Sequence, residues 1–350
     1  MDSPIDSRRP EVIFAFNGDA DGIISQHLVL LAGISPTQRL TGLKRDLRLL
    51  RTLRRPASSD TADRPLDLYV FDINLRDSRD DLYGLLQNPT TNVVWYDHHE
   101  PGDIPDSPRL RTRIATTRTA CTGLLVHADL LAQGRGQDPR WAAIAAWGDN
   151  LPEGAEALLA PLNLSPASRE ALREAGELLN YNAYGETPDD VLYQPLHVAE
   201  RMAGFRDPEA FIRESGLIEP LRRQFAEDER SFGGLNPDSE SPGASVYVLP
   251  GTGWARRLGS TWANRAAREN PDRAFAVLHP QADGQYQVSI RAPRGRADAP
   301  PAFSLAEQFP SGGGRALAAG INRLPASGVE AFTRRFMETY GSYGRPAGSP

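Results

Sequence analysis

The feature that most constrains the fold is a set of three short apolar runs, each followed at once by polar side chains. These runs are residues 12–16, 68–71 and 93–96. Their length and their β-branched and aromatic content are typical of buried strands in a parallel sheet. Helical spacing or composition marks four further segments, residues 22–31, 78–86, 119–131 and 139–147. This alternation predicts an α/β fold, with an N-terminal largely parallel sheet flanked by helices in the order βαβαβαα.

The length of 350 residues predicts about two domains, because a single core seldom grows that large. We expect the first domain at residues 1–150. Strand signals then disappear, and amphipathic segments predict a helical connector over residues 151–232. Residues 233–243 are rich in Gly, Pro, Ser and Asn, which is typical of a linker. New strand and helix signals predict a smaller C-terminal α/β domain over residues 244–342, before a disordered tail at 343–350.

Composition and charge narrow the class of protein. No apolar run is long enough to span a membrane, and the first ten residues lack the apolar core of a signal peptide. Cys121 is the only cysteine, which excludes an internal disulfide and favours a packed thiol in a reducing compartment. We therefore expect a cytoplasmic protein without a membrane partner. The net charge of −6 argues against a stable complex with long nucleic acid, which requires an excess of Lys and Arg.

The first polar motif follows residues 12–16 and reads Asn17-Gly18-Asp19-Ala20-Asp21-Gly22. Ligands of open α/β sheets bind outside the carboxyl ends of the strands, which is where this motif lies. Carboxylates this close would repel one another without a cation, so the spacing favours a metal site. A helix cap followed by a turn would use the same residue types.

Three more motifs follow in order along the chain. Asp72 comes directly after the second apolar run, Asp97-His98-His99 comes after the third, and Asp149 follows an apolar helix and a terminating glycine. Taken alone, Asp72 also suits a cap and Asp149 a polar loop. Imidazole and carboxylate ligands together suit manganese, iron, cobalt or zinc better than calcium or magnesium.

Joined in this order, the four motifs resemble those of the DHH phosphoesterase superfamily, over residues 14–150. The resemblance continues with Ser311-Gly312-Gly313-Gly314-Arg315 and Ala318-Ala319-Gly320, which look like the glycine-rich signature of the DHH-associated substrate domain. In architecture the chain is similar to RecJ-like exonucleases, oligoribonucleases and cyclic-dinucleotide phosphodiesterases. Family II inorganic pyrophosphatases share only the catalytic half.

The resemblance implies two divalent cations, with Mn²⁺ expected and Mg²⁺ or Co²⁺ as alternatives. Carried over by motif, the first cation would be held by Asn17, Asp19 and Asp72. The second would be held by Asp21, Asp72, His98 and Asp149. The catalytic group would be Asp97, His98 and His99, in which Asp97 and His99 orient ligands or contact phosphate. Asn17 stands where relatives have His or Asp, and a neutral ligand should weaken the first cation site.

We expect substrate binding by His99, Arg291, Gly312, Gly313, Gly314 and Arg315. The resemblance implies this role for the glycine segment with Arg315, and Arg291, which follows an expected strand at residues 287–290, could supplement it. The glycine amides would face an anion just ahead of an expected helix start. Arg315 stands where the signature often has His, and its guanidinium would keep a cation near the phosphate. The alternative is a flexible loop with solvated arginines.

A basic segment recurs at helical intervals and could guide a polyanion. Its members are Lys44, Arg45, Arg48, Arg51, Arg54 and Arg55. A solvated helix face has the same spacing, and no aromatic side chains are interleaved to stack bases. We therefore favour the solvated helix face.

The function that the resemblance implies is hydrolysis of a phosphodiester or phosphoanhydride. Two cations would hold a phosphate between them and activate a water for in-line attack. The expected partner is a small phosphorylated substrate or short oligonucleotide: an oligoribonucleotide, a cyclic dinucleotide, short polyphosphate or single-stranded DNA. The alternative is a non-catalytic nucleotide-binding regulatory protein of the same fold, which the neutral Asn17 favours.

Overall fold

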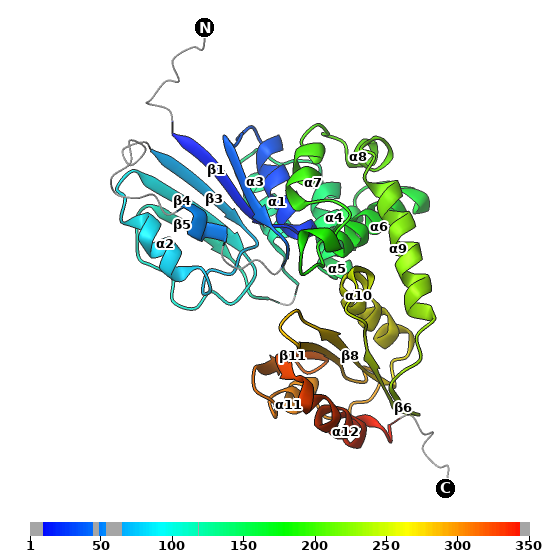
Figure 1. The fold of residues 1–350 in the computed structure, drawn as a ribbon. Coiled ribbons are helices and arrows are strands. Elements are labelled where there is room, and N and C mark those ends of the chain that lie inside the picture. Colours follow the sequence, from blue (N-terminus) through cyan, green and yellow to red (C-terminus); the bar gives the residue numbers. More distant parts are fainter. Residues whose placement is uncertain (1–9, 45–48, 54–64, 118, 344–350) are drawn as a thin grey trace. The chain divides into compact units, whose positions relative to one another are not determined.

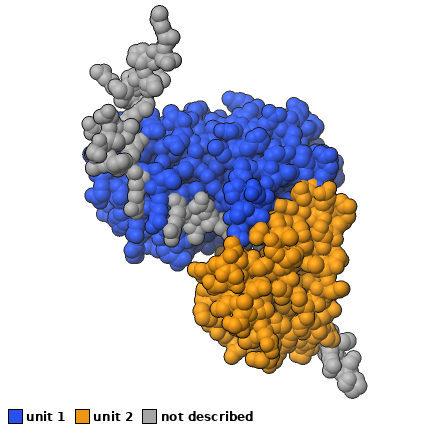
Figure 2. Space-filling view, viewed as in Figure 1, with its two compact units in different colours: residues 1–223 blue, residues 224–350 orange. Residues whose placement is uncertain are grey.

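The structure, a computed structural model, describes residues 10–44, 49–53, 65–117 and 119–343. The chain divides into two compact units, residues 1–223 and 224–350, which Figure 2 colours blue and orange. The division falls inside helix α9 (Ile218–Gly233). Each unit contains its own β-sheet (Figure 1). None of the helices in the described ranges has the length and apolar character needed to cross a membrane.

The sheet of the first unit has five parallel strands in the order β2-β1-β3-β4-β5. The strands are β1 (Glu11–Asn17), β2 (Gln38–Gly42), β3 (Leu66–Phe71), β4 (Thr91–Asp97) and β5 (Leu110–Ile114). The predicted α/β class is confirmed, but the predicted order lacked β2 and β5. Both are edge strands whose residues are mostly partly exposed, so neither carries the apolar run that identifies a central strand.

The register of this sheet determines where the polar motifs meet. Asn17 at the end of β1 pairs with Gly42 of β2, and Phe16 pairs with Phe71 of β3. Phe71 in turn pairs with Tyr96 of β4. The residues that follow these strands therefore emerge side by side at one edge of the sheet, as the parallel arrangement requires.

Helices cover both faces of the sheet (Figure 1). These elements are α1 (Ala20–Leu31), the 3₁₀ helix η1 (Leu49–Leu53), α2 (Arg79–Leu86), α3 (Thr122–Ala132) and α4 (Pro139–Gly148). Leucines of η1 and α2 pack with Ile13 and Ala15 on one face. On the other face α1 and α3 contact the strands and α4 packs against both. Because both faces are covered, Trp95 and Phe14 are fully buried.

The rest of the first unit is helical, as predicted. Its elements are α5 (Pro152–Leu159), α6 (Pro166–Asn182), the 3₁₀ helix η2 (Pro188–Asp190), α7 (Pro195–Met202), α8 (Pro208–Glu214) and the start of α9. Each α-helix from α5 to α8 begins with a proline, whose fixed φ and missing N–H suit the first helical position. Helices α5 and α6 pack against α4, whose far end carries one of the site residues.

The second unit is built on a six-stranded sheet in the order β10-β11-β9-β8-β7-β6. Its strands are β6 (Ser239–Ser241), β7 (Ala244–Val248), β8 (Ala274–Pro280), β9 (Gln285–Arg291), β10 (Gly312–Gly314) and β11 (Ala318–Pro325). Only β7 and β8 are parallel. Helix α10 (Gly253–Glu269) contacts β8 and β9, while α11 (Ala302–Ala306), the short η3 (Ala326–Gly328) and α12 (Val329–Tyr340) complete the unit. The segment expected as a linker contains β6, and residues 344–350 of the expected tail lie outside the described ranges.

The glycine-rich segment differs from its prediction. Residues 312–314 do not precede a helix; they form β10, which pairs antiparallel with β11. The glycines serve close approach, since a Cβ on Gly312 would lie 1.8 Å from the carbonyl oxygen of Ala306. Gly314 has φ 145, which other residues rarely adopt. The predicted helix start after these glycines is wrong, because the glycines are needed for close backbone packing within the sheet.

Candidate metal centre

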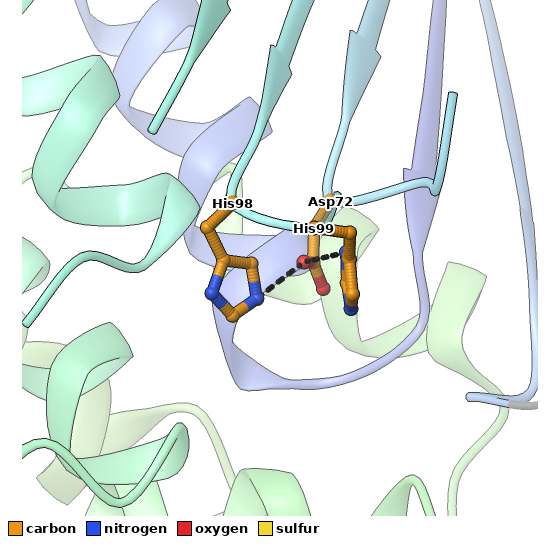
Figure 3. Close-up of side chains that lie close together, drawn as sticks. All are labelled: Asp72, His98 and His99. Atoms are coloured by element: carbon orange, nitrogen blue, oxygen red, sulfur yellow. Dashed lines mark ion pairs between the residues drawn. The ribbon is translucent and has the colours of Figure 1, made fainter. Parts of the chain in front are cut away.

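Acidic and imidazole side chains from four segments converge at the carboxyl edge of the first sheet. Asp72, His98 and His99 each offer a ligand atom within 4.8 Å of the others, and so do Asp21, His98 and Asp149. Figure 3 shows both imidazole rings directed at the carboxylate of Asp72. The structure thus brings together four of the six residues expected to bind metal.

Asp72 lies at the centre of this cluster and has an unusual backbone. It follows β3 directly, its N–H donates to the carbonyl of Tyr96, and it has φ 56. The left-handed region is uncommon for residues other than glycine, although aspartate tolerates it best together with asparagine and histidine. The carboxylate lies 3.3 Å from His98 Nε2 and accepts a hydrogen bond from Thr122 Oγ1 at 3.3 Å. Asp72 is only 3% exposed.

Asp21 connects two helices at the site. Its carboxylate oxygens accept hydrogen bonds from the backbone N–H groups of Thr122 and Gly123, both at 2.7 Å. These are the first two residues of α3, where N–H groups lack partners within the helix and an anion is favoured. A Cβ on Gly123 would lie 2.6 Å from the Cβ of Ala145, so glycine permits this close packing. One carboxylate therefore fixes α3 against α1.

The Asp97-His98-His99 motif is internally organised. The Oδ1 atom of Asp97 accepts from the backbone N–H groups of His98 and His99, at 2.8 and 3.2 Å, and lies 2.7 Å from His99 Nδ1. His98 Nδ1 lies 3.1 Å from the carbonyl oxygen of Ala120, which leaves Nε2 directed at Asp72. A carbonyl partner of this kind fixes the tautomer of a metal-binding histidine.

The carboxylates of the cluster repel one another. Burial, reinforced by the charge of Asp72, raises the pKa of Asp21 to about 7. Burial and the charge of Asp19 raise the pKa of Asp72 to about 7. For His98, burial lowers the pKa, but its hydrogen bond to Asp72 and the surrounding carboxylates outweigh this effect and raise it to about 10. A divalent cation would relieve this repulsion.

Asp149 is the C-cap of α4, where a carboxylate meets the negative end of the helix dipole. Its Oδ2 atom lies 3.7 Å from His98 Nδ1, and its side chain is 22% exposed. Burial and the charge of Asp21 raise its pKa to about 6. A helix would gain nothing from an acid at this position, so the cluster is the better explanation for it.

Asp19, expected with Asn17 at the first cation, lies beside Asp72 but has further partners of its own. Asp19 is the N-cap of α1, and its Oδ1 accepts from the N–H of Gly22 at 3.1 Å. Its Oδ2 lies 2.7 Å from Lys44 Nζ. The buried side-chain oxygen of Asn17 and the Oδ2 of Asp97 have no hydrogen-bond partner among the described residues. Asp19 belongs to neither of the two groups of acidic and imidazole side chains that could hold a metal within those ranges.

The expectation of a solvated helix face for the basic segment is wrong for Lys44. Lys44 follows β2 and its side chain is 24% exposed. Arg51 lies in η1, and Arg45, Arg48, Arg54 and Arg55 lie outside the described residues. The place of Lys44 beside Asp19 could not be predicted, because it depends on the edge strand β2, which carries no apolar run. The polar Thr122, which bonds both Asp21 and Asp72, was also missed, as it was read as an ordinary helix residue.

The lone cysteine is a packed thiol. Cys121 is fully buried at the N-cap of α3. Burial, reinforced by the charges of Asp21 and Asp149, raises its pKa well above the usual value. It therefore remains protonated and offers no nucleophile.

The proposed substrate residues of the second unit cluster near one hairpin. Arg315 is exposed in the turn between β10 and β11, where its N–H donates to the carbonyl of Ala318 at 2.7 Å. Ala318 pairs with Arg291 in β9. The Nε of Arg291 donates to Asn264 Oδ1 at 2.7 Å, which orients the guanidinium. The register thus brings Arg291 and the turn of Arg315 to the same end of this sheet.

No protein-family model matches the sequence, and no curated protein matches it. Solved structures are similar over nearly the whole chain. RecJ of Thermus thermophilus in complex with Mn²⁺ has a TM-score of 0.57 at 17% identity, covering 93% of this chain and 51% of its own. The DHH domain of a member of the s1p family of ribosomal proteins has a TM-score of 0.61 at 14% identity, covering 95% and 88%.

The fold is therefore the one found in this RecJ and in this DHH domain, in agreement with the fold that the ordered motifs predicted. The chain spans about half the length of the RecJ chain that it resembles.

Proposed function

We propose that the chain is a divalent-cation-dependent hydrolase that cleaves phosphodiester or phosphoanhydride bonds in a small or short nucleotide or polyphosphate. The observation that carries this proposal is the convergence of Asp21, Asp72, His98 and Asp149 at one sheet edge. Three of these are carboxylates with raised pKa values, an arrangement that favours a bound cation.

The donor set fits a transition-metal ion. Imidazole nitrogen mixed with carboxylate oxygen suits Mn²⁺ or Co²⁺, and Mg²⁺ less well. The Mn²⁺ in the RecJ structure supports the choice of manganese. When bound, such a cation would polarise the phosphoryl oxygen and lower the pKa of a water for attack. A second cation, as in the two-cation mechanism, would have to use Asn17 and Asp19 beside Asp72.

The side chains of the chain would have distinct roles. Cation binding at Nε2 of His98 would displace a proton, while Nδ1 keeps its partner at Ala120. Asp97 orients the ring of His99, which is 41% exposed and would contact the substrate phosphate. We assign further phosphate binding to Arg291, Arg315 and the glycines of β10, because guanidinium groups and backbone N–H groups suit phosphate oxygens.

The test is a screen of the purified chain with Mn²⁺ on dinucleotides, cyclic dinucleotides, short polyphosphate and single-stranded DNA, with products separated by chromatography. We expect Mn²⁺-stimulated hydrolysis of one class. Asp72→Asn removes the central carboxylate while tolerating φ 56 and should abolish turnover. The matched control is Asp106→Asn, which changes an exposed aspartate outside the cluster. Equal activity of both variants would refute the assigned centre.

One observation favours a second candidate, a nucleotide-binding regulatory protein. The neutral Asn17 and the ion pair of Asp19 with Lys44 both reduce the negative charge available to a first cation. A pure binder would retain nucleotide without Mn²⁺-stimulated turnover of any substrate in the screen, including an activated aryl phosphodiester. Hydrolysis that disappears in Asp72→Asn would exclude this candidate.

A further inference from the structure

Lys44 is the only lysine in the chain, and every other one of the 39 basic residues is an arginine. It lies two residues beyond β2, at the same sheet edge as Asn17 and Asp72. A chain that otherwise uses only arginine has a lysine at this one place. The ammonium group of lysine is a compact point charge, whereas the guanidinium group of arginine is a broad planar fork. The compact charge is the better match to a site of the size that a metal ion occupies.

The ammonium group is held on several sides. Its Nζ lies 2.7 Å from Asp19 Oδ2, 3.1 Å from Asn180 Oδ1 at the end of α6, and 5.0 Å from the ring centroid of Tyr184. A carboxylate, an amide oxygen and an aromatic face are all groups that stabilise an ammonium ion. Burial lowers the pKa of Lys44, but Asp19, Tyr184 and Asp149 outweigh this effect, so the group stays charged.

This arrangement conflicts with a divalent cation at the same place. The first cation of the resemblance would be held by Asn17, Asp19 and the shared Asp72, and of these Asn17 brings no charge. Both oxygens of Asp19 are already used, Oδ1 by the N–H of Gly22 and Oδ2 by Lys44. A cation there would lie close to an ammonium group, and because Asp19 already pairs with that group and Asn17 is neutral, only Asp72 would remain to offset the repulsion.

We propose that Lys44 replaces the first of the two cations, so that the chain binds one divalent cation, on Asp21, Asp72, His98 and Asp149. The inference rests on the proposed function for the existence of that cation. In this site one fixed monovalent charge and one exchangeable divalent charge would together offset most of the negative charge of the carboxylates. The hydrolytic activity should then rise with the concentration of the divalent cation along a one-site saturation curve.

The test measures stoichiometry, not turnover. The metal-stripped wild-type chain is saturated with Mn²⁺, the bound ion is counted by equilibrium dialysis, and electron paramagnetic resonance is recorded. We expect one Mn²⁺ per chain and the six-line spectrum of an isolated ion. Two ions with an exchange-coupled spectrum would overturn the inference while leaving the proposed function intact. No bound ion would overturn both.

Variants separate the contribution of Lys44 from that of Asn17. Asn17→Asp alone should still bind one Mn²⁺, because Lys44 remains. Adding Lys44→Met to Asn17→Asp should admit a second ion at least about 100-fold more tightly than Asn17→Asp alone. Lys44→Arg in the Asn17→Asp chain keeps the positive charge and should remain at one ion. A second ion in Asn17→Asp alone, or only one in the double variant, would refute the role of Lys44.

A measurement on the wild-type chain avoids any folding defect of the variants. Because there is a single lysine, ¹³C-labelled lysine gives one side-chain ε resonance. We expect this resonance to keep the position of a bound ammonium group, as in the metal-free chain, when diamagnetic Mg²⁺ saturates the protein. A shift to the position of a free, solvated lysine would show that the divalent cation displaces Lys44, and would overturn the proposal.

Discussion

Replacing Asp149 by asparagine should stabilise the metal-free chain. Asp149 has a pKa of about 6 in the folded state against an ordinary value of 3.8, so ionising it opposes folding. Each pKa unit corresponds to about 1.4 kcal/mol, which gives about 3 kcal/mol for Asp149→Asn at pH 8. The side chain has no short ion pair to lose, since its nearest charged partner, His98 Nδ1, is 3.7 Å away.

The pH dependence fixes the sign of this effect. Between pH 3.8 and 6 the folded chain holds a proton on Asp149 that the unfolded chain has released, so wild-type stability falls as pH rises through this window. The gain in Asp149→Asn should therefore be small near pH 4, about half its full size at pH 5, and constant above pH 7. Asp106→Asn, which changes an exposed aspartate, is the matched control.

Urea denaturation with a chelator and then with Mn²⁺ provides the measurement. A saturating ligand at 100 times its Kd stabilises the folded state by about 2.7 kcal/mol. The wild-type chain should gain this stability from Mn²⁺, and Asp149→Asn should gain much less because it has lost a ligand. The reasoning fails if Asp149→Asn is no more stable than wild type in chelator at pH 8, or if Mn²⁺ stabilises both equally.

Three further predictions concern single residues. Asp72→Ala should lower activity far more than Asn17→Ala, because Asp72 lies at the centre of the cluster whereas Asn17 is a neutral side chain; equal losses in kcat would contradict this. Arg315→Ala should reduce turnover of the natural substrate by about 10–1000-fold at unchanged metal content, since a guanidinium cannot coordinate a cation; loss of bound Mn²⁺ would disprove a substrate role. In the metal-free chain, burial lowers the pKa of His99 and Asp97 raises it above the usual value, so Asp97→Asn should lower it; an unchanged NMR titration of His99 would disprove the pairing.

The central part of the fold could be predicted because it has a strong physical signal. Strands β1, β3 and β4 are covered on both faces, so their sequences are apolar runs and each ends in a polar residue. Strands β2 and β5 lie at the sheet edges, and sequences such as Gln38–Gly42 carry polar side chains that face solvent. These two strands form because they pair with β1 and β4, and no local sequence pattern shows such pairing.

The difference between central strands and edge strands also explains which site residues could be predicted. Asp21, Asp72, His98 and Asp149 follow recognisable strands and helices, so their convergence followed from the parallel arrangement. Lys44 follows an edge strand without an apolar run, and its basic neighbours have the spacing of a helix. The prediction of a helix start after the glycines of β10 was wrong for another reason. These glycines allow close approach to the carbonyl group of Ala306, and no sequence pattern shows that this group is near in space.

The parallel sheet also sets the order in which the site can form during folding. The residues of the cluster are spread along the chain from Asp21 in α1 to Asp149 at the end of α4. Because parallel pairing is non-local, a chain emerging from the ribosome cannot join Asp21 to the start of α3 until more than 120 residues have been made. Cation binding should therefore appear only in the last phase of folding, after the central strands have paired, and a nascent chain ending before α4 should not retain the ion.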